Sequence, residues 1–203
     1  MPAPQKTSQL PWLAPGVVLG ALLPLGLLLV RLLDHELGAD PVAIALNQLG
    51  LLALILLLAS LAATPLRLLF SITWPMRLRR TLGLLAFFYA ALHFLTYVII
   101  DQGSSWSALF ADVTKRKFIT AGFAAFVLLI PLAATSTKRM VQRLGGPRWR
   151  RLHRLVYVAG LCAVLHFVWR VKKDLSEPLL YAFVLLGLFA VRVMNLAKRR
   201  GLL

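Results

Sequence analysis

The sequence predicts an all-α integral membrane protein, a bundle of six transmembrane helices with both termini in the cytoplasm. Of the 203 residues, 60% are apolar and only 15% are charged, and the mean hydropathy is +0.79. A soluble domain averages about 45–50% apolar and about 25% charged residues. This composition excludes a disordered chain, which needs low hydrophobicity. The net charge of +16 does not indicate a nucleic-acid partner, because too little polar sequence remains for a soluble basic surface.

Six stretches are long and apolar enough to cross a bilayer, which takes about 20 mostly apolar residues in a helix. In order along the chain they are 14–33, 42–63, 81–100, 118–135, 152–170 and 178–196. The first has the position of a signal peptide, but its apolar run is too long and no small-residue cleavage site follows, so we expect a retained helix. No soluble domain and no internal repeat is visible, and residues 1–203 are expected to form a single transmembrane domain.

Each connection carries charged residues or prolines, which end one span and begin the next. In order they are Asp34 to Pro41, Thr64 to Arg80, Asp101 to Lys117, Ser136 to Arg151 and Val171 to Pro178. Proline fits the first turn of a helix and interrupts a helix that precedes it. The connections therefore predict where each span stops.

The charges predict the orientation. If both termini are cytoplasmic, the inner segments, from Lys6 to Arg200, hold 16 of the Lys and Arg residues and no acid. The outer segments hold the other seven cations and all seven acids. Because cytoplasmic loops carry the excess of Lys and Arg, this count predicts cytoplasmic termini. The inner cations also suit contact with anionic membrane lipid.

Two histidines are predicted at the same depth in the membrane. An ionisable side chain within a span is costly and indicates function. His93 precedes Asp101 by about two helical turns, and His166 precedes Asp174 by the same interval, on two spans that both run outward. At about 1.5 Å per residue, each lies about 12 Å below the outer surface. A lone histidine in a span can simply hydrogen-bond a neighbouring helix, but this depth match favours axial ligation of one haem.

A third histidine, His153, precedes His166 on the fifth span and lies about 20 Å deeper toward the cytoplasm. There it could ligate a second haem. Against this, the intervening residues turn the side chain by about 220° on a straight helix, so the two histidines would lie on different faces. The matching position of the third span is Arg80, which is no ligand. Both alternatives stay open, and His35 is expected to be an ordinary surface residue of an outer loop.

Several segments resemble the MsrQ family, also called YedZ. They are ELGADP (36–41), LAATPLR (61–67), RRTLGLLAFFYAALHFLTY (79–97), KRKFITAG (115–122), TST (135–137) and RWRRLHRLVY (148–157), followed by His166 and Val171-Lys172. Taken in order these motifs are specific, and the resemblance runs from about residue 15 to the end. One departure is Asn47, where members often carry histidine.

The MsrQ family comprises haem-binding membrane subunits of the bacterial protein-methionine-sulfoxide reductase system, similar to ferric-reductase and NADPH-oxidase transmembrane domains. The resemblance implies a b-type haem, with His93, His153 and His166 at haem-associated positions, and an associated FMN. It implies a bacterial inner (cytoplasmic) membrane protein that transfers electrons without reducing the final substrate itself. Electrons would come from the quinone pool or a cytosolic flavin reductase. They would pass to a periplasmic molybdopterin subunit that reduces methionine sulfoxide in oxidised envelope proteins.

Two other functions fit the sequence less well. A stand-alone ferric or quinone reductase on the same scaffold would need its own nucleotide-binding domain or a soluble donor, and no nucleotide-binding fingerprint is present. A haem-free transporter or assembly factor is disfavoured, because transporters tend to show internal repeats and broken helices at the midplane. We further expect a donor to approach the inner arginines of segments 77–80 and 150–154, and a periplasmic partner to approach outer loop 101–117 with its Lys115-Arg116-Lys117 triplet.

Overall fold

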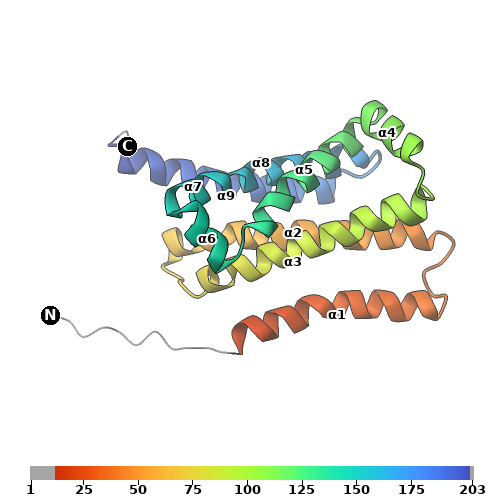
Figure 1. Cartoon of the computed structure of the whole chain (residues 1–203), viewed down its shortest axis with the longest axis horizontal. Coiled ribbons are helices and arrows are strands. Elements are labelled where there is room, and N and C mark those ends of the chain that lie inside the picture. Colours follow the sequence, from red (N-terminus) through yellow and green to blue (C-terminus); the bar gives the residue numbers. More distant parts are fainter. Residues whose placement is uncertain (1–11, 202–203) are drawn as a thin grey trace.

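The six predicted spans are present as helices. The computed structural model describes residues 12–201, and six helical stretches in it are long and apolar enough to cross a membrane. They are α1 (Leu13–Leu33), α2 (Pro41–Phe70), α3 (Pro75–Leu95) continued by the π-helical turn η1 (Thr96–Asp101), α5 (Lys117–Ala134), α7 (Gly146–Leu152) continued by α8 (Leu155–Arg170), and α9 (Ser176–Arg199). The prediction of an all-α, six-span membrane protein is confirmed (Figure 1).

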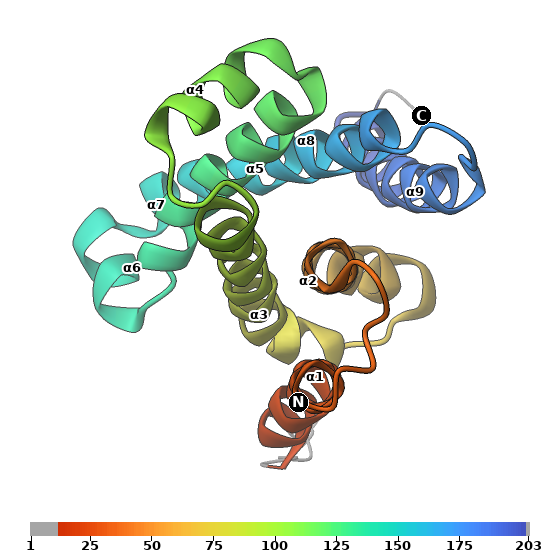
Figure 2. The same ribbon diagram turned by 90° about the vertical axis from the view of Figure 1, so that its right-hand side faces the viewer.

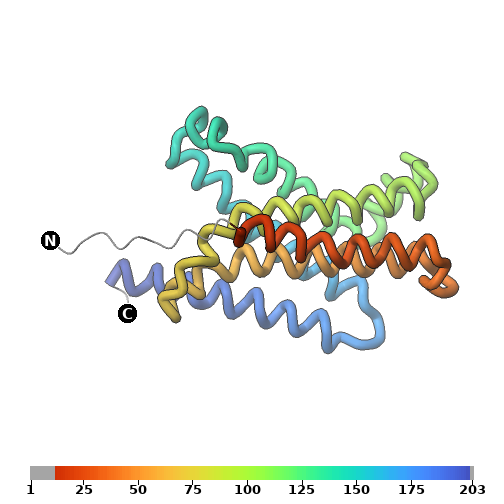
Figure 3. The backbone as a smooth tube through the Cα atoms, turned by 90° about the horizontal axis from the view of Figure 1, so that it is seen from below, coloured from red at the N-terminus to blue at the C-terminus, as the bar shows by residue number. Residues whose placement is uncertain are grey.

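The spans run back and forth between two ends of one bundle, and α1 begins at the end where α9 finishes (Figures 1 and 3). We name these ends by their charges. The basic end holds residues 71–74 and 135–154, including the short helix α6 (Lys138–Leu144). The acidic end holds residues 34–40, 102–116 and 171–175, including the short helix α4 (Trp106–Lys115). Lys6, which we counted with the basic end, lies outside the described residues.

Helix α2 continues to Phe70, beyond the predicted end at residue 63, although it contains Pro65. Proline has no N–H, so Pro65 leaves the carbonyl of Leu61 without its donor within the helix. The guanidinium of Arg192 on α9 donates to that carbonyl through Nη2 and to the Leu188 carbonyl through Nη1 at 2.8 Å. Arg192 therefore supplies the hydrogen bond that the Leu61 carbonyl lacks because of Pro65, and this contact links α9 to α2.

Two other spans differ from the expected bounds. Helix α3 begins at Pro75, six residues before the predicted start, because proline suits the first turn of a helix. The expected continuous helix 152–170 is interrupted: α7 ends at Leu152 and α8 begins at Leu155. The straight-helix geometry that we used to compare His153 with His166 is therefore wrong at this point.

Side-chain caps fix several helix starts at the bundle ends. Asp40 accepts the backbone N–H of Ala43 at 2.9 Å to begin α2. Ser105 and Thr137 accept backbone N–H groups in the same way to begin α4 and α6. Such caps stabilise a helix by about 1 kcal/mol each.

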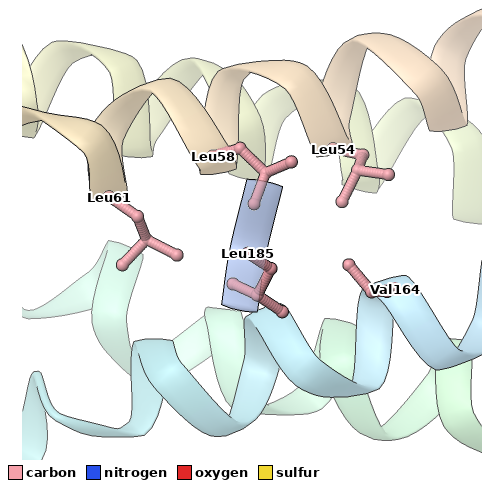
Figure 4. Packing of buried hydrophobic residues seen from close by; sticks show 5 residues of the cluster. All are labelled: Leu54, Leu58, Leu61, Val164 and Leu185. Carbon is pink, nitrogen blue, oxygen red and sulfur yellow. The ribbon is translucent and has the colours of Figure 1, made fainter. Parts of the chain in front are cut away.

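Two helix pairs, α2 with α3 and α5 with α8, form the centre of the bundle. They meet at a core of four buried residues, one from each helix: Leu57, Ala86, Leu129 and Ala159. A second core of leucine and valine joins α2, α8 and α9 through Leu54, Leu58, Leu61, Val164 and Leu185 (Figure 4). The small alanines let the helices approach closely, as is typical of membrane bundles.

Helix α1 lies at the periphery of the bundle, against α2 and α3 (Figure 2). The Tyr89 hydroxyl donates to the carbonyl of Ala21, and the Gln48 amide donates to the carbonyl of Pro24 at 3.2 Å. The opposite face of α1 is apolar and open, with Leu19 and Leu23 each about two-thirds exposed. Such a face is unfavourable in water and is what lipid contact requires.

Candidate cofactor site

A cavity of about 770 Å³ lies between α2, α3, α5 and α8 and extends to α4 at the acidic end. Pockets for drug-sized ligands and cofactors are typically about 300–1,000 Å³ and mostly apolar. The walls here are largely leucine, alanine and phenylalanine, and Phe94 of α3 stacks on Phe126 of α5 with ring centres 4.7 Å apart. His93 and His166 are the two histidines that line this cavity among the described residues.

The His93 ring is held by the backbone of the neighbouring helix. Its Nδ1 lies 2.9 Å from the carbonyl oxygen of Leu46 on α2. A carbonyl only accepts, so Nδ1 carries the proton and donates, and Nε2 keeps its lone pair. This is the tautomer in which a histidine can ligate a metal through Nε2, with its other nitrogen oriented by a backbone acceptor.

The His166 ring is held in the same way. Its Nδ1 donates to the carbonyl oxygen of Phe118 on α5 over 2.7 Å, which leaves Nε2 with its lone pair. The centres of the His93 and His166 rings are 6.1 Å apart, and the ring planes are inclined by 80°. The structure therefore brings together the two histidines that the sequence predicts at equal depth.

The separation of these rings fits two ligands of one metal ion. Because a metal–imidazole bond is about 2.0 Å long, ring centres 6.1 Å apart are close enough for both histidines to bind the same ion. Within residues 12–201 no group of three or more His, Cys, Asp or Glu side chains gathers to hold a metal. Two histidines complete a coordination shell only when another ligand supplies the rest. A haem would supply four further nitrogen ligands, and the cavity volume of about 770 Å³ is in the range of cofactor pockets.

Two glycines make room for the histidines. A methyl group at Gly122 of α5 would lie 2.6 Å from Nδ1 of His166, closer than real carbon contacts permit. A methyl group at Gly50 of α2 would lie 3.1 Å from Nδ1 of His93, which is tight. Each glycine lies four residues after the carbonyl that accepts from the same ring. Backbone contact between helix and imidazole thus requires glycine at position 122 and leaves little room for a side chain at position 50.

His153 lies apart from this cavity, at the basic end between α7 and α8. The Thr135 hydroxyl donates to the carbonyl of Pro131 at 2.6 Å, so it accepts from Nε2 of His153 at 3.0 Å. The ring also stacks on Trp149 with centres 3.9 Å apart, and Trp149 donates to the Thr135 carbonyl at 2.9 Å. His153 thus has a role in packing, and its Nε2 is already used in the hydrogen bond to Thr135.

Polar residues line the cavity near the acidic end. Asp112 of α4 accepts from the Tyr97 hydroxyl at 2.7 Å and pairs with Arg116 at 3.2 Å, which fastens α4 to the end of the third span. Arg170 lies one turn beyond His166 and has no hydrogen bond or ion pair within the described residues. Asn47 also lines the cavity. Cationic side chains beside a cavity of this shape suit the carboxylates of an amphipathic ligand.

Sequence reasoning missed Gly50, Gly122 and the two carbonyls that orient the histidines. Small residues near the two histidines serve two purposes: Ala90 and Ala163 line the cavity, whereas Ala86 and Ala159 are fully buried in the helix–helix core.

Comparisons with known proteins identify the family of the chain. Residues 48–164 match the ferric reductase like transmembrane component family, and this segment contains Gly50, His93, Gly122 and His153. The chain is 52% identical over 184 residues to the protein-methionine-sulfoxide reductase heme-binding subunit MsrQ of Rhodospirillum rubrum, covering 91% of this chain and 88% of that protein. The chain belongs to the MsrQ family.

Other MsrQ relatives show the same coverage. The MsrQ protein of Deinococcus radiodurans is 52% identical over 187 residues, covering 92% of each chain. That of Herminiimonas arsenicoxydans is 46% identical over 185 residues, covering 90% of this chain and 85% of the relative. No solved structure matches the chain. The resemblance seen in the motifs therefore extends over almost the whole MsrQ length.

Proposed function

We propose that this MsrQ-family protein is the haem-binding membrane subunit of a protein-methionine-sulfoxide reductase system and carries electrons across the membrane. The observation that carries the proposal is the pair of imidazoles, His93 and His166, 6.1 Å apart in one cavity with both Nε2 atoms free to bind. A bound b-type haem would supply one-electron chemistry at its iron. The relatives' names, which call them heme-binding subunits of this reductase system, support it.

The chain's own residues would set the properties of that cofactor. The carbonyls of Leu46 and Phe118 hold the two rings in one tautomer and one orientation, which raises the basicity of the coordinating nitrogens. The walls of the cavity are largely apolar, and such surroundings would influence the reduction potential of a bound haem. The metal-binding residues would be His93 and His166, and His153 remains a proposed ligand only for a second haem.

The charges support an inner-membrane protein with both termini in the cytoplasm. The segments assigned to the cytoplasm hold 16 of the Lys and Arg residues and no acid, and the segments assigned to the outside hold all seven acids. Electrons would enter at the basic end from the quinone pool or a cytosolic flavin reductase, with FMN bound in association. They would leave at the acidic end to a periplasmic molybdopterin methionine sulfoxide reductase that repairs oxidised envelope proteins. The protein itself would not reduce the final substrate.

The alternative is a stand-alone ferric or quinone reductase. The match of residues 48–164 to ferric reductase like transmembrane components favours it as the second candidate, because it describes the same helices. The two differ in their acceptor. Purified protein reduced in vesicles would pass electrons to the periplasmic reductase in the first case and directly to ferric chelates or quinone in the second.

The experiment that tests the proposal is a reduced-minus-oxidised visible spectrum of the purified protein, with haem quantified per chain. We expect a low-spin b-type spectrum at one haem per chain, or two if His153 ligates a second. A colourless protein after expression with adequate haem supply would overturn both the proposal and the alternative.

A further inference from the structure

The two helix pairs that carry the histidines share one sequence pattern. Four residues of α2 recur in α5 at one constant offset: Gly50, Ala53, Leu56 and Leu57 correspond to Gly122, Ala125, Leu128 and Leu129. Five residues of α3 recur in α8, again at a constant offset: Ala86, Ala90, Leu92, His93 and Phe94 correspond to Ala159, Ala163, Leu165, His166 and Phe167. The expectation that the chain has no internal repeat is therefore wrong.

The corresponding residues also occupy corresponding places. The four-residue core at the centre of the bundle consists of two such pairs, Leu57 with Leu129 and Ala86 with Ala159, and both alanines are 0% exposed. Three further pairs line the cavity on its two sides: Gly50 with Gly122, Ala53 with Ala125, and Ala90 with Ala163. The residues that recur in the sequence therefore also occupy equivalent positions in the structure.

Each copy holds its histidine by the same contacts. The hydrogen bond from Nδ1 joins the ring to a carbonyl at almost the same sequence separation in both copies, from His93 to Leu46 and from His166 to Phe118. The accepting carbonyl lies four residues before the glycine, and residues four apart share one face of a helix. The imidazole edge therefore lies over the glycine while Nδ1 reaches the carbonyl one turn away. A side chain in place of Gly122 would occupy the position of the ring, and one in place of Gly50 would press against the ring.

We infer that Gly50 and Gly122 are positioning residues, each of which fixes the tautomer and rotation of the histidine that the second helix of its copy presents to the cavity. The group that such a pair of histidines takes is a flat metal macrocycle bound between the copies, with one imidazole from each. The inference rests on the proposed function for the identity of that group, but the repeat and the histidine contacts stand without it.

The two copies differ in tightness, which gives the inference a graded consequence. The Cβ of an alanine would lie 2.6 Å from Nδ1 at Gly122 and 3.1 Å at Gly50. At Gly122 the His166 ring must leave its place, and its hydrogen bond to Phe118 is lost. At Gly50 a shift of a few tenths of an ångström relieves the contact. Loss of an interaction that orients a metal ligand costs about 10–100-fold in affinity.

The test compares Gly122→Ala and Gly50→Ala with two control variants. Gly83→Ala places its methyl group in ordinary contact, 3.5 Å from the Ser60 hydroxyl, and Gly20→Ala places it in open space. We expect haem affinity about 10–100-fold weaker in Gly122→Ala, a smaller loss in Gly50→Ala, and unchanged affinity in both controls. The electron paramagnetic resonance spectrum of the haem that remains should change in the first two variants, because the ring planes turn.

Two further measurements keep the test decisive. Should Gly122→Ala fail to accumulate in the membrane, adding His166→Ala should restore accumulation, because the clash is with that ring. Nitrogen-15 spectra of the haem-free protein should show Nδ1-protonated His93 and His166, and Gly122→Ala should perturb His166 alone. A wild-type protein without haem would overturn the proposed function, while these spectra would still test the inference. A wild type with haem, and glycine variants that behave like Gly83→Ala, would overturn the inference alone.

Discussion

At the acidic end, His93 and His166 donate from Nδ1 to helix carbonyls and face a cavity, whereas at the basic end His153 donates from Nε2 to Thr135 and stacks on Trp149. All three histidines lie within or at the edge of spans, and the resemblance to the MsrQ family predicts a haem-associated role for each. Their hydrogen bonds separate them. When one ring nitrogen of a histidine is hydrogen-bonded to the protein, only the other nitrogen is available to bind a metal.

The same contrast holds for the charged groups at the two ends. Near the acidic end, Arg170 lies beside the cavity with no partner within the described residues, and Asp112 ties α4 over it. Toward the basic end, the guanidinium group of Arg192 donates hydrogen bonds to backbone carbonyls of α2 and α9. The bundle therefore encloses a cavity toward the acidic end, whereas the polar side chains described toward the basic end are used in contacts between helices.

The largest effect should come from removing a cavity histidine. His93→Ala or His166→Ala should each lose most low-spin haem while the protein still inserts, because each would remove one of the two proposed haem ligands. Haem per chain and the reduced spectrum measure this, with His35→Ala as the control in an exposed loop. Full low-spin haem in either variant would contradict the pairing.

The next prediction concerns His153 and sharpens the contrast between the two ends. His153→Ala should keep the His93–His166 haem and its spectrum, and Thr135→Val should do the same, because the two residues serve packing at the junction of α5 and α7. Their expected effect is a destabilisation of about 1–3 kcal/mol from the broken hydrogen bond, measured by thermal unfolding in detergent. Loss of half the haem in His153→Ala would instead establish a second haem there.

Most of the fold was predictable from the sequence because six apolar runs and their charges follow from the bilayer itself. The helix bounds were harder to predict. Pro65 predicts the end of a helix, but α2 continues through it, and Arg192, distant in sequence, donates to the carbonyl that the proline leaves without a partner. Within the site, the depth of His93 and His166 followed from spacing, but their carbonyl partners depend on how helices pack. Gly50 and Gly122 could have been found from the repeated pattern around the histidines, which places each glycine at almost the same interval ahead of its ring.

The packing role of Arg192 gives a third, smaller prediction. Arg192→Leu should destabilise the protein by about 1–3 kcal/mol, because the Leu61 carbonyl is left without a donor in an apolar environment. In a Pro65→Ala background the helix supplies its own N–H, so the same substitution should cost less. Unfolding of the four variants in a double-mutant cycle measures this coupling. An equal cost in both backgrounds would show that Arg192 does not act through that carbonyl.

A fourth prediction asks whether the basic end also receives electrons. Arg79→Gln with Arg80→Gln should slow haem reduction by quinol or reduced flavin severalfold in correctly oriented vesicles, because guanidinium groups bind the phosphate of a flavin nucleotide and donate hydrogen bonds to the oxygens of a quinol. The haem spectrum should not change, since neither residue lines the cavity. Lys198→Gln with Arg199→Gln is the matched control at the same end. Equal reduction rates in all variants would leave these arginines as contacts to anionic lipid.

The smallest effect is expected at the outer surface of the acidic end. Helix α4 exposes Trp106 and Phe110, each about three-quarters exposed, next to Lys115 and Lys117. Arg116 belongs to a different contact, because it pairs with Asp112 and lines the cavity. We therefore expect Lys115→Gln with Lys117→Gln to slow electron transfer to the periplasmic reductase at low salt, since steering by exposed charges acts on the association rate.

The salt dependence and a matched control decide how local this steering is. The haem spectrum of the Lys115→Gln, Lys117→Gln variant should stay intact, and its difference from wild type should vanish at high salt, where such charges are screened. Lys172→Gln with Lys173→Gln, on another loop of the same end, separates a local docking surface from general attraction. If both pairs of substitutions slow transfer equally, the charge of the whole end and not α4 guides the partner. If neither does, Trp106 and the lysines serve only to place α4 at the lipid headgroups.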